Sequence, residues 1–225
     1  MMEARIHAAL QRRPRPWWPG ALRRFPVAKT HAEHVLIGSA RDAANAQWLW
    51  DAGITHVLNC GGAEAEGVHV ARDAATGRER PLTVLTLDNI VDSRHERILR
   101  KFFAAAAAFL DEARDAPSGR ALVHCVAGIN RSVTLASAYV SSRAGVPVDV
   151  VVDRIAAARP SVLTNSAFCE QLARWEDEIA APLSLAETGR ARDAFFPSGA
   201  VAALLPIVVV MLLLAAAARV ALGAA

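Results

Sequence analysis

The stretch VHCVAGINRS, residues 123–132, brings a histidine, a cysteine, a glycine, an arginine and a serine together in a chain with only three cysteines. Arg131 follows Cys125 by six residues, and Gly128 lies between them. If a strand ends before this loop and a helix begins near Arg131, the backbone N–H groups of the loop point into one concavity at the positive end of the helix dipole. Such a loop binds a phosphate dianion.

The same residues supply the groups that would act on that phosphate. The field at a helix N-terminus favours the thiolate of Cys125, and a thiolate beside a bound phosphate can attack phosphorus. Arg131 can bind two phosphate oxygens, and Ser132 can donate its hydroxyl to the sulfur when the sulfur leaves. His124 is expected to support the loop and the thiolate through its ring hydrogen bonds. The expected phosphate-binding residues are Val126, Ala127, Gly128, Ile129, Asn130 and Arg131.

Short apolar segments rich in β-branched residues predict the strands that position this loop. These strands are expected at residues 35–38, 56–60, 82–87 and 121–125. Helical patterns cover residues 43–53, 96–114, 132–144 and 149–158, and a last helix is capped by Asn165. In that helix one face is formed by Phe168, Leu172, Trp175 and Ile179. This alternation predicts an α/β fold with a central, largely parallel or mixed sheet flanked by helices.

The order His-Cys-x-x-Gly-x-x-Arg-Ser in HCVAGINRS resembles the signature of the cysteine-dependent protein phosphatases, and of their dual-specificity branch in particular. Residues 34–60 and 159–176 are similar to the opening and closing segments of that branch. The resemblance covers about residues 29–180. It implies a cysteine-phosphatase fold and catalysis through a phosphocysteine, with no metal or other cofactor.

The resemblance also implies an aspartate that protonates the leaving alcohol, on a loop ahead of a helix. Asp92 lies ten residues before Phe102, which is the spacing at which the family places its acid before a helix phenylalanine. Asp88 directly follows an apolar strand and is interpreted as a turn residue. We therefore expect Asp92 to be the general acid, and the base in the second step.

Two further cysteines have a simple interpretation as small buried hydrophobic residues, Cys60 and Cys169. However, some relatives carry a cysteine that forms a reversible disulfide with the nucleophile. Cys60 ends a strand whose family counterpart lies beside the catalytic loop, so it is a possible redox partner of Cys125.

Residues 194–218 form a run of 25 residues without a charge, and ~20 suffice to cross a bilayer. We expect a transmembrane helix there, joined to the catalytic domain (29–180) by a linker at 181–193 and followed by a short tail at 219–225. A span at this position predicts a tail-anchored protein.

Residues 1–28 are expected to form a basic, flexible leader or lipid-touching arm, with six arginines: Arg5, Arg12, Arg13, Arg15, Arg23 and Arg24. The odd number and wide spacing of the cysteines indicate a reducing compartment, so the catalytic domain should face the cytosol. Arginines flank the span on both sides, which leaves the endoplasmic reticulum and the mitochondrial outer membrane as alternatives.

Several functions share such a loop: a phosphatase for phosphotyrosine and phosphoserine or phosphothreonine in proteins, a phosphoinositide or phosphatidylglycerol phosphate phosphatase, an RNA 5′ phosphatase, or a pseudophosphatase that binds phosphoproteins. The variable loop positions contain no lysine or arginine, which disfavours headgroups with several phosphates. Asn130 resembles a variant of RNA-directed relatives, but the expected anchor and retained acid oppose that function. The formal net charge of +3 also does not argue for nucleic-acid binding. A phosphoprotein phosphatase is therefore the favoured interpretation.

Overall fold

A computed structural model of the chain describes residues 2–11, 28–29, 32–159 and 161–183. The chain divides into two units at residue 177, and the description below concerns the first of them, residues 1–177, together with the end of its last helix. The expected span at 194–218 and the tail that follows it lie outside the described residues, as does the linker beyond residue 183. Within the described ranges, no helix has the length and apolar character that a membrane crossing requires.

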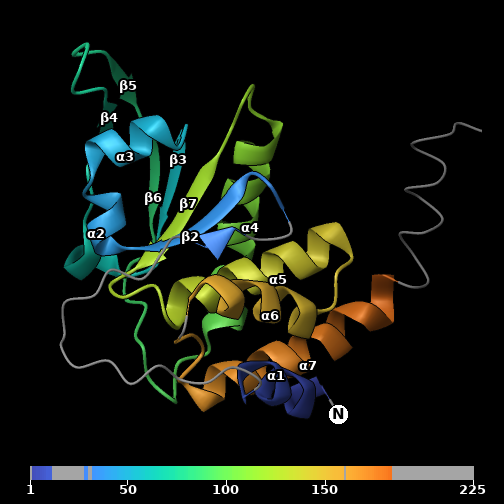
Figure 1. Cartoon of the computed structure of the whole chain (residues 1–225). Helices are drawn as coiled ribbons and strands as arrows, with labels where there is room; N and C mark the ends of the chain where they lie inside the picture. Colours follow the sequence, from blue (N-terminus) through green and yellow to red (C-terminus); the bar gives the residue numbers. More distant parts are fainter. Residues whose placement is uncertain (1, 12–27, 30–31, 160, 184–225) are drawn as a thin grey trace, which may run out of the picture. The chain divides into compact units, whose positions relative to one another are not determined.

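The centre of the first unit is a five-stranded sheet with the strand order β1-β2-β7-β3-β6 (Figure 1). The neighbours β2, β7, β3 and β6 are parallel, and only the two-residue β1 pairs antiparallel with β2. The strands are β1 (Ala28–Lys29), β2 (Val35–Ser39), β3 (His56–Asn59), β6 (Thr83–Thr86) and β7 (Ala121–Cys125). The four predicted strands are thus confirmed, and they form the largely parallel sheet that was expected.

The two faces of this sheet pack against different helices (Figure 1). Because side chains alternate along a strand, Leu122 of β7 faces one core and Val123 faces the other. The smaller core includes residues of α3, and the larger core includes residues of α4, α5, α6 and α7. The helices are α2 (Ala40–Ala43), α3 (Ala46–Asp51), α4 (Ile98–Asp115), α5 (Arg131–Ala144), α6 (Val148–Ala158) and α7 (Ser166–Leu183), with a short 3-10 helix at Gly62–Ala65.

Each predicted helix is present, with boundaries that differ by a few residues. Asn165 caps α7 as expected, because its Oδ1 accepts a hydrogen bond from the Ala167 N–H at 3.2 Å. Phe168 and Leu172 of α7 are fully buried in the larger core, and Trp175 packs against it. Burial on this face explains why the helical pattern of apolar residues predicted the element.

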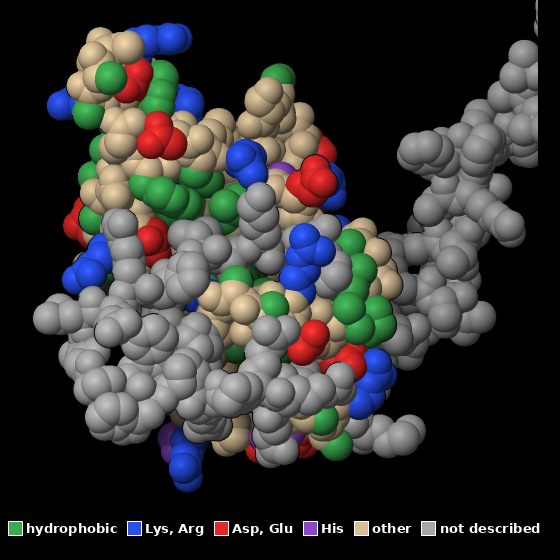
Figure 2. Space-filling view, viewed as in Figure 1, with side chains coloured by type: hydrophobic (Ala, Val, Ile, Leu, Met, Phe, Trp, Pro, Cys, Tyr) green, Lys and Arg blue, Asp and Glu red, His purple; other side chains and the backbone are tan. Residues whose placement is uncertain are grey.

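A charged hairpin of β4 (Val70–Arg72) and β5 (Glu79–Pro81) was not predicted. Its strands are mostly exposed and carry charged residues, and an ion pair joins Arg72 to Glu79. Basic and acidic side chains gather over it in the space-filling view (Figure 2). Arg80 anchors the hairpin to α3, with its guanidinium 4.9 Å from the ring centre of Trp50.

The N-terminal segment differs from the flexible leader expected over residues 1–28. Residues 2–11 form the helix α1 (Met2–Gln11), which contacts α6. Ile6 is fully buried in the larger core, and Arg5 forms a two-point ion pair with Asp149 of α6 at 2.9 and 3.0 Å. The burial of Ile6 explains why this segment is helical, because a helix of ten residues needs tertiary packing to be stable. The arginines at positions 12–24 lie outside the described residues.

Candidate active site

The phosphate loop, defined as residues 125–130, connects the end of β7 to the start of α5. Cys125 is buried at the end of β7, with 2% of its surface exposed. Its Sγ accepts a hydrogen bond from the Gly128 N–H at 3.3 Å and lies 3.4 Å from Ser132 Oγ. The sulfur therefore has two donors within reach, as a nucleophile that later becomes a leaving group requires.

The first turn of α5 is open to an anion. Asn130 occupies the N-cap position, but its side chain makes no cap hydrogen bond to the helix. The first N–H groups of a helix have no acceptor within the helix, and they bind anions when no side chain caps them. The helix N-terminus thus adds backbone donors to the phosphate loop.

Arg131 lies at this helix start and is mostly buried, with 8% of its surface exposed. Its Nη1 donates to the carbonyl oxygen of Ile90 at 3.3 Å. Its Nε is buried and has no hydrogen-bond partner among the described residues. A buried donor without a partner is costly, so this nitrogen is available to a phosphate oxygen.

The structure joins Asp92 to the phosphate loop by a hydrogen bond, and among the described residues no such bond joins Asp88 to the loop. Asp92 Oδ2 accepts a hydrogen bond from Asn130 Nδ2 at 3.0 Å. Asp88 is an exposed residue in the turn after β6, and the next residue, Asn89, has a positive φ of 58°. The geometry therefore matches the expected arrangement of an acid on a loop ahead of α4.

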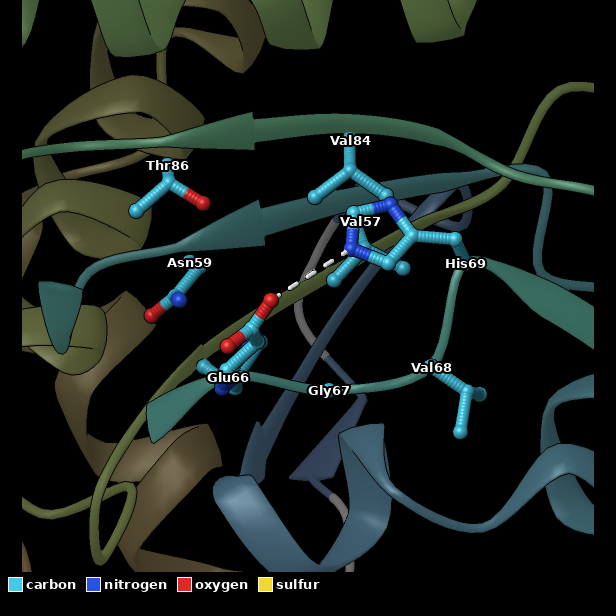
Figure 3. Close-up of a pocket in the computed structure, with 9 residues that line it drawn as sticks. Val57, Asn59, Glu66, Gly67, Val68, His69, Val84 and Thr86 are labelled. Atoms are coloured by element: carbon cyan, nitrogen blue, oxygen red, sulfur yellow. Dashed lines mark ion pairs between the residues drawn. The ribbon is translucent and has the colours of Figure 1, made fainter. Parts of the chain in front are cut away.

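His124 points away from the nucleophile. Side chains two positions apart in a strand share a face, so His124 lies on the face of Leu122, in the smaller core, and Cys125 lies on the other face. His124 lines a small pocket whose other lining residues include Asn59 and Glu66. Figure 3 shows Asn59 and Glu66 at this pocket. That pocket has a volume of about 10 Å³, which admits at most a water molecule. At its edge an ion pair of 3.9 Å joins His69 to Glu66.

The ring of His124 is fully enclosed. Burial lowers its pKa to about 4, against the opposing effects of the Cys125 backbone and the Asp42 carboxylate. The imidazole is therefore neutral near pH 7. Both ring nitrogens are buried without a hydrogen-bond partner among the described residues, so the ring hydrogen bonds that were expected to support the loop and the thiolate are not present there.

Comparison with known proteins agrees with this geometry. The sequence profile of the dual specificity phosphatase catalytic domain matches residues 35–178. The chain belongs to the dual-specificity phosphatase family. It contains a cysteine-dependent dual-specificity phosphatase catalytic domain, whose matched region includes both the phosphate loop and Asp92.

Curated relatives are similar over part of their length. Mouse dual specificity protein phosphatase 1 is 34% identical over 99 residues, which are 44% of this chain and 27% of the relative. Human dual specificity protein phosphatase 4 is 29% identical over 165 residues, covering 73% of this chain and 37% of the relative. The chain thus covers 27% and 37% of the length of these two relatives.

Solved structures share the fold over nearly their whole length. A mouse putative dual specificity phosphatase complexed with zinc tungstate has a TM-score of 0.57 and 28% identity, covering 74% of this chain and 95% of that one. A variant of human DUSP28 has a TM-score of 0.57 and 26% identity, covering 69% and 97%.

This dual-specificity phosphatase domain also uses a buried arginine that the sequence did not single out. Arg159 is fully buried, and its Nη2 donates to the carbonyl oxygen of Ala127 in the phosphate loop at 3.0 Å. Burial lowers its pKa, against the opposing negative charges of Asp42 and Cys125. Because Arg159 holds the Ala127 carbonyl oxygen, it helps the backbone N–H groups of the phosphate loop to face the phosphate. In the sequence it was only the residue that ends a helix before Pro160.

Cys60 and Cys169 are both free, buried cysteines. Cys60 lies near the site, and Cys169 lies elsewhere in the core. Burial raises the pKa of the Cys60 thiol well above its ordinary value, and the charge of Cys125 acts in the same direction while Arg131 opposes it. Cys60 is therefore a protonated thiol near neutral pH. This form is a poor nucleophile, so any disulfide with Cys125 would form slowly.

Proposed function

We propose that the chain is a membrane-anchored dual-specificity protein phosphatase that hydrolyses phosphotyrosine and phosphoserine or phosphothreonine through a phosphocysteine. The observation that carries the proposal is the meeting of three groups. They are a cysteine sulfur between two donors, an uncapped helix N-terminus, and an aspartate hydrogen-bonded to the phosphate loop.

In the first step Cys125 Sγ attacks phosphorus, the S–P bond forms and the P–O bond to the substrate alcohol breaks. Asp92 donates a proton to that alcohol oxygen as it leaves. The phosphate charge is held by the loop N–H groups and by Arg131.

In the second step water attacks the phosphorus of the phosphocysteine and gives a proton to Asp92. The S–P bond breaks, and Ser132 Oγ, 3.4 Å from the sulfur, stabilises the thiolate as it leaves. Inorganic phosphate is released, and the enzyme returns to its starting protonation state.

The rim of the site favours a phosphoprotein over a headgroup with several phosphates. Val91, next to Asp92, is 54% exposed, and Val126 on the phosphate loop is 42% exposed. These apolar side chains suit the body of a phosphorylated amino acid and offer no charge to a second phosphate, although the cation Arg94 lines the adjoining pocket with Asp92.

The hydrogen bonds of Asn130 do not favour an RNA substrate. Its Nδ2 donates to Asp92 and Thr164, and its Oδ1 accepts from Thr164 Oγ1 and from the Asn165 N–H. Because both ends of the amide are used inside the protein, the side chain is not free to bind a nucleotide.

The membrane part of the proposal rests on the uncharged run at residues 194–218. The catalytic domain is proposed to face the cytosol, at the endoplasmic reticulum or the mitochondrial outer membrane, since all three cysteines are free thiols. A phosphatidylglycerol phosphate or phosphoinositide phosphatase is the second candidate, favoured by the same run.

The test is to measure phosphate release by the full chain from phosphopeptides, from phosphoinositide or phosphatidylglycerol phosphate vesicles, and from triphosphate-ended RNA. The highest kcat/KM is expected for phosphopeptides. A preference for vesicles would support the lipid phosphatase instead, and phosphopeptide binding without any release would indicate a pseudophosphatase.

A further inference from the structure

Asp92 is held by two side-chain amides from different parts of the chain. Its Oδ2 accepts a hydrogen bond from Asn130 Nδ2 at 3.0 Å, and its Oδ1 accepts one from Asn165 Nδ2 at 3.0 Å. We call Asn130 and Asn165 the amide clamp. Since one amide ends the phosphate loop and the other caps α7, the clamp fixes the carboxyl group relative to both elements.

The orientation of each amide is set by further hydrogen bonds. Asn130 Oδ1 accepts from the Asn165 N–H at 3.2 Å, and Asn165 Oδ1 accepts from the Ala167 N–H at 3.2 Å. A backbone N–H is a donor only, so each amide must turn its oxygen toward it and its NH₂ group toward Asp92. The clamp therefore presents two donors to the carboxyl group, and neither amide can flip without losing a bond.

Asp92 and the clamp line an open pocket of about 440 Å³ beside the phosphate loop. Every lining residue is polar: Asp92, Ser93, Arg94, Asn130, Thr164, Asn165 and Ser166. Each carboxyl oxygen can accept more than one hydrogen bond, so either oxygen can carry the transferable proton while both clamp bonds remain. The clamp is thus compatible with proton donation.

We propose that Asn130 and Asn165 are positioning residues that aim the Asp92 carboxyl group at the leaving oxygen before substrate binds. The inference rests on the proposed function, because it assigns the proton donor to Asp92. The clamp explains why Asn130, an N-cap residue by position, does not cap α5. A serine at position 130 would be too short to replace the amide, since its hydroxyl is one bond from Cβ.

The consequence is a dependence on the leaving group. An aryl phosphate with an acidic phenol leaves with little protonation, whereas a phosphoserine ester needs the proton in the transition state. Loss of the clamp should therefore slow phosphoserine peptides more than p-nitrophenyl phosphate. A role in holding the loop alone would slow both substrates equally.

The experiment measures kcat/KM of the full chain on both substrates for Asn130→Ser and Asn165→Ser. Asn165→Ser keeps a side-chain oxygen that can cap α7, but its hydroxyl is too short to reach Asp92. Each variant is expected to lose about tenfold on the phosphoserine peptide, since a bond to a charged group is removed, and about twofold or less on p-nitrophenyl phosphate. Ser166→Ala is the matched control, because it changes the same pocket without touching Asp92, and it should keep wild-type values on both.

A double-mutant cycle separates positioning from a general loss of structure. In the Asp92→Ala background, Asn130→Ser and Asn165→Ser should each change kcat/KM on the phosphoserine peptide by about twofold or less, since the group that Asn130 and Asn165 position is gone. Full additive losses in that background, or equal losses on the two substrates, would overturn the proposal. If Asp92→Ala itself left the phosphoserine rate unchanged, the assignment of the acid in the proposed function would be wrong instead.

Discussion

Replacing Gly128 by alanine tests how tightly the phosphate loop is packed. Gly128 has a φ of +69°, a backbone conformation that residues with a side chain rarely adopt. A Cβ there would overlap the carbonyl oxygen of Gly38 and lie 2.6 Å from Arg159 Nη2. The substitution therefore adds a strained backbone conformation and a steric overlap with two elements that hold the loop.

The two effects have different magnitudes, and Gly77 allows them to be separated. Gly77 also has a φ of +69°, but its Cβ would meet nothing within 4 Å. The left-handed conformation costs about 1–2 kcal/mol for a residue with a side chain. Overpacking a buried site adds about 1–3 kcal/mol. Gly77→Ala should therefore lower the free energy of unfolding by about 1–2 kcal/mol, and Gly128→Ala by about 2–5 kcal/mol.

The assay is urea unfolding of both variants, together with kcat/KM on p-nitrophenyl phosphate. Gly128 N–H donates to Cys125 Sγ at 3.3 Å, so a shifted loop also misplaces the nucleophile. We expect about a hundredfold loss of kcat/KM for Gly128→Ala and no change for Gly77→Ala. If both variants were equally stable and equally active, the close approach of the loop to Gly38 and Arg159 would be refuted.

Three further predictions follow from burial and from the C-terminal run. Because the pKa of His124 is about 4 in the folded protein and 6.5 in the unfolded chain, up to about 3 kcal/mol of the free energy of unfolding present above pH 6.5 should be lost as the pH falls to about 4. The free energy of unfolding of His124→Gln should fall less over that range, and an equal fall would contradict the role of burial. Peroxide converts Cys125 to a sulfenic acid, and Cys60 can attack its sulfur to form a disulfide and water, slowly because the Cys60 thiol is protonated near neutral pH. After long exposure to peroxide, Cys60→Ser should lower the recovery of activity by thiols, and unchanged inactivation and recovery would exclude Cys60 as redox partner. Deleting residues 194–225 should release the protein from membranes and leave p-nitrophenyl phosphate hydrolysis unchanged, whereas retained membrane binding would argue against the proposed anchor.

The parallel strands and most helices could be predicted because their burial leaves a pattern in the chain. The strand at residues 121–125 is buried throughout and reads as an apolar run. The hairpin of β4 and β5 was missed because each strand has only three residues, of which the outer two are exposed, and the strands carry charges. Nothing in residues 2–11 alone indicates that Ile6 would find a place in the core.

Some residues of the site could likewise be predicted from the sequence, and others could not. The phosphate loop is continuous in sequence, so Cys125 and Arg131 were identified from their spacing. The contacts of Asp92 to Asn130 and Asn165 span 38 and 73 residues, and no local pattern encodes them. Arg159 was missed because an arginine that ends a helix is usually solvated, and only the fold shows that this one is buried.

The central claim is that catalysis proceeds through a phosphocysteine at Cys125. The most direct measurement mixes the full chain with a radiolabelled phosphopeptide, quenches the reaction within one turnover and locates the label by peptide mapping. We predict a labelled peptide that contains Cys125, and neither label nor phosphate release for Cys125→Ser. Phosphate release without label on Cys125, or turnover by Cys125→Ser, would contradict the account.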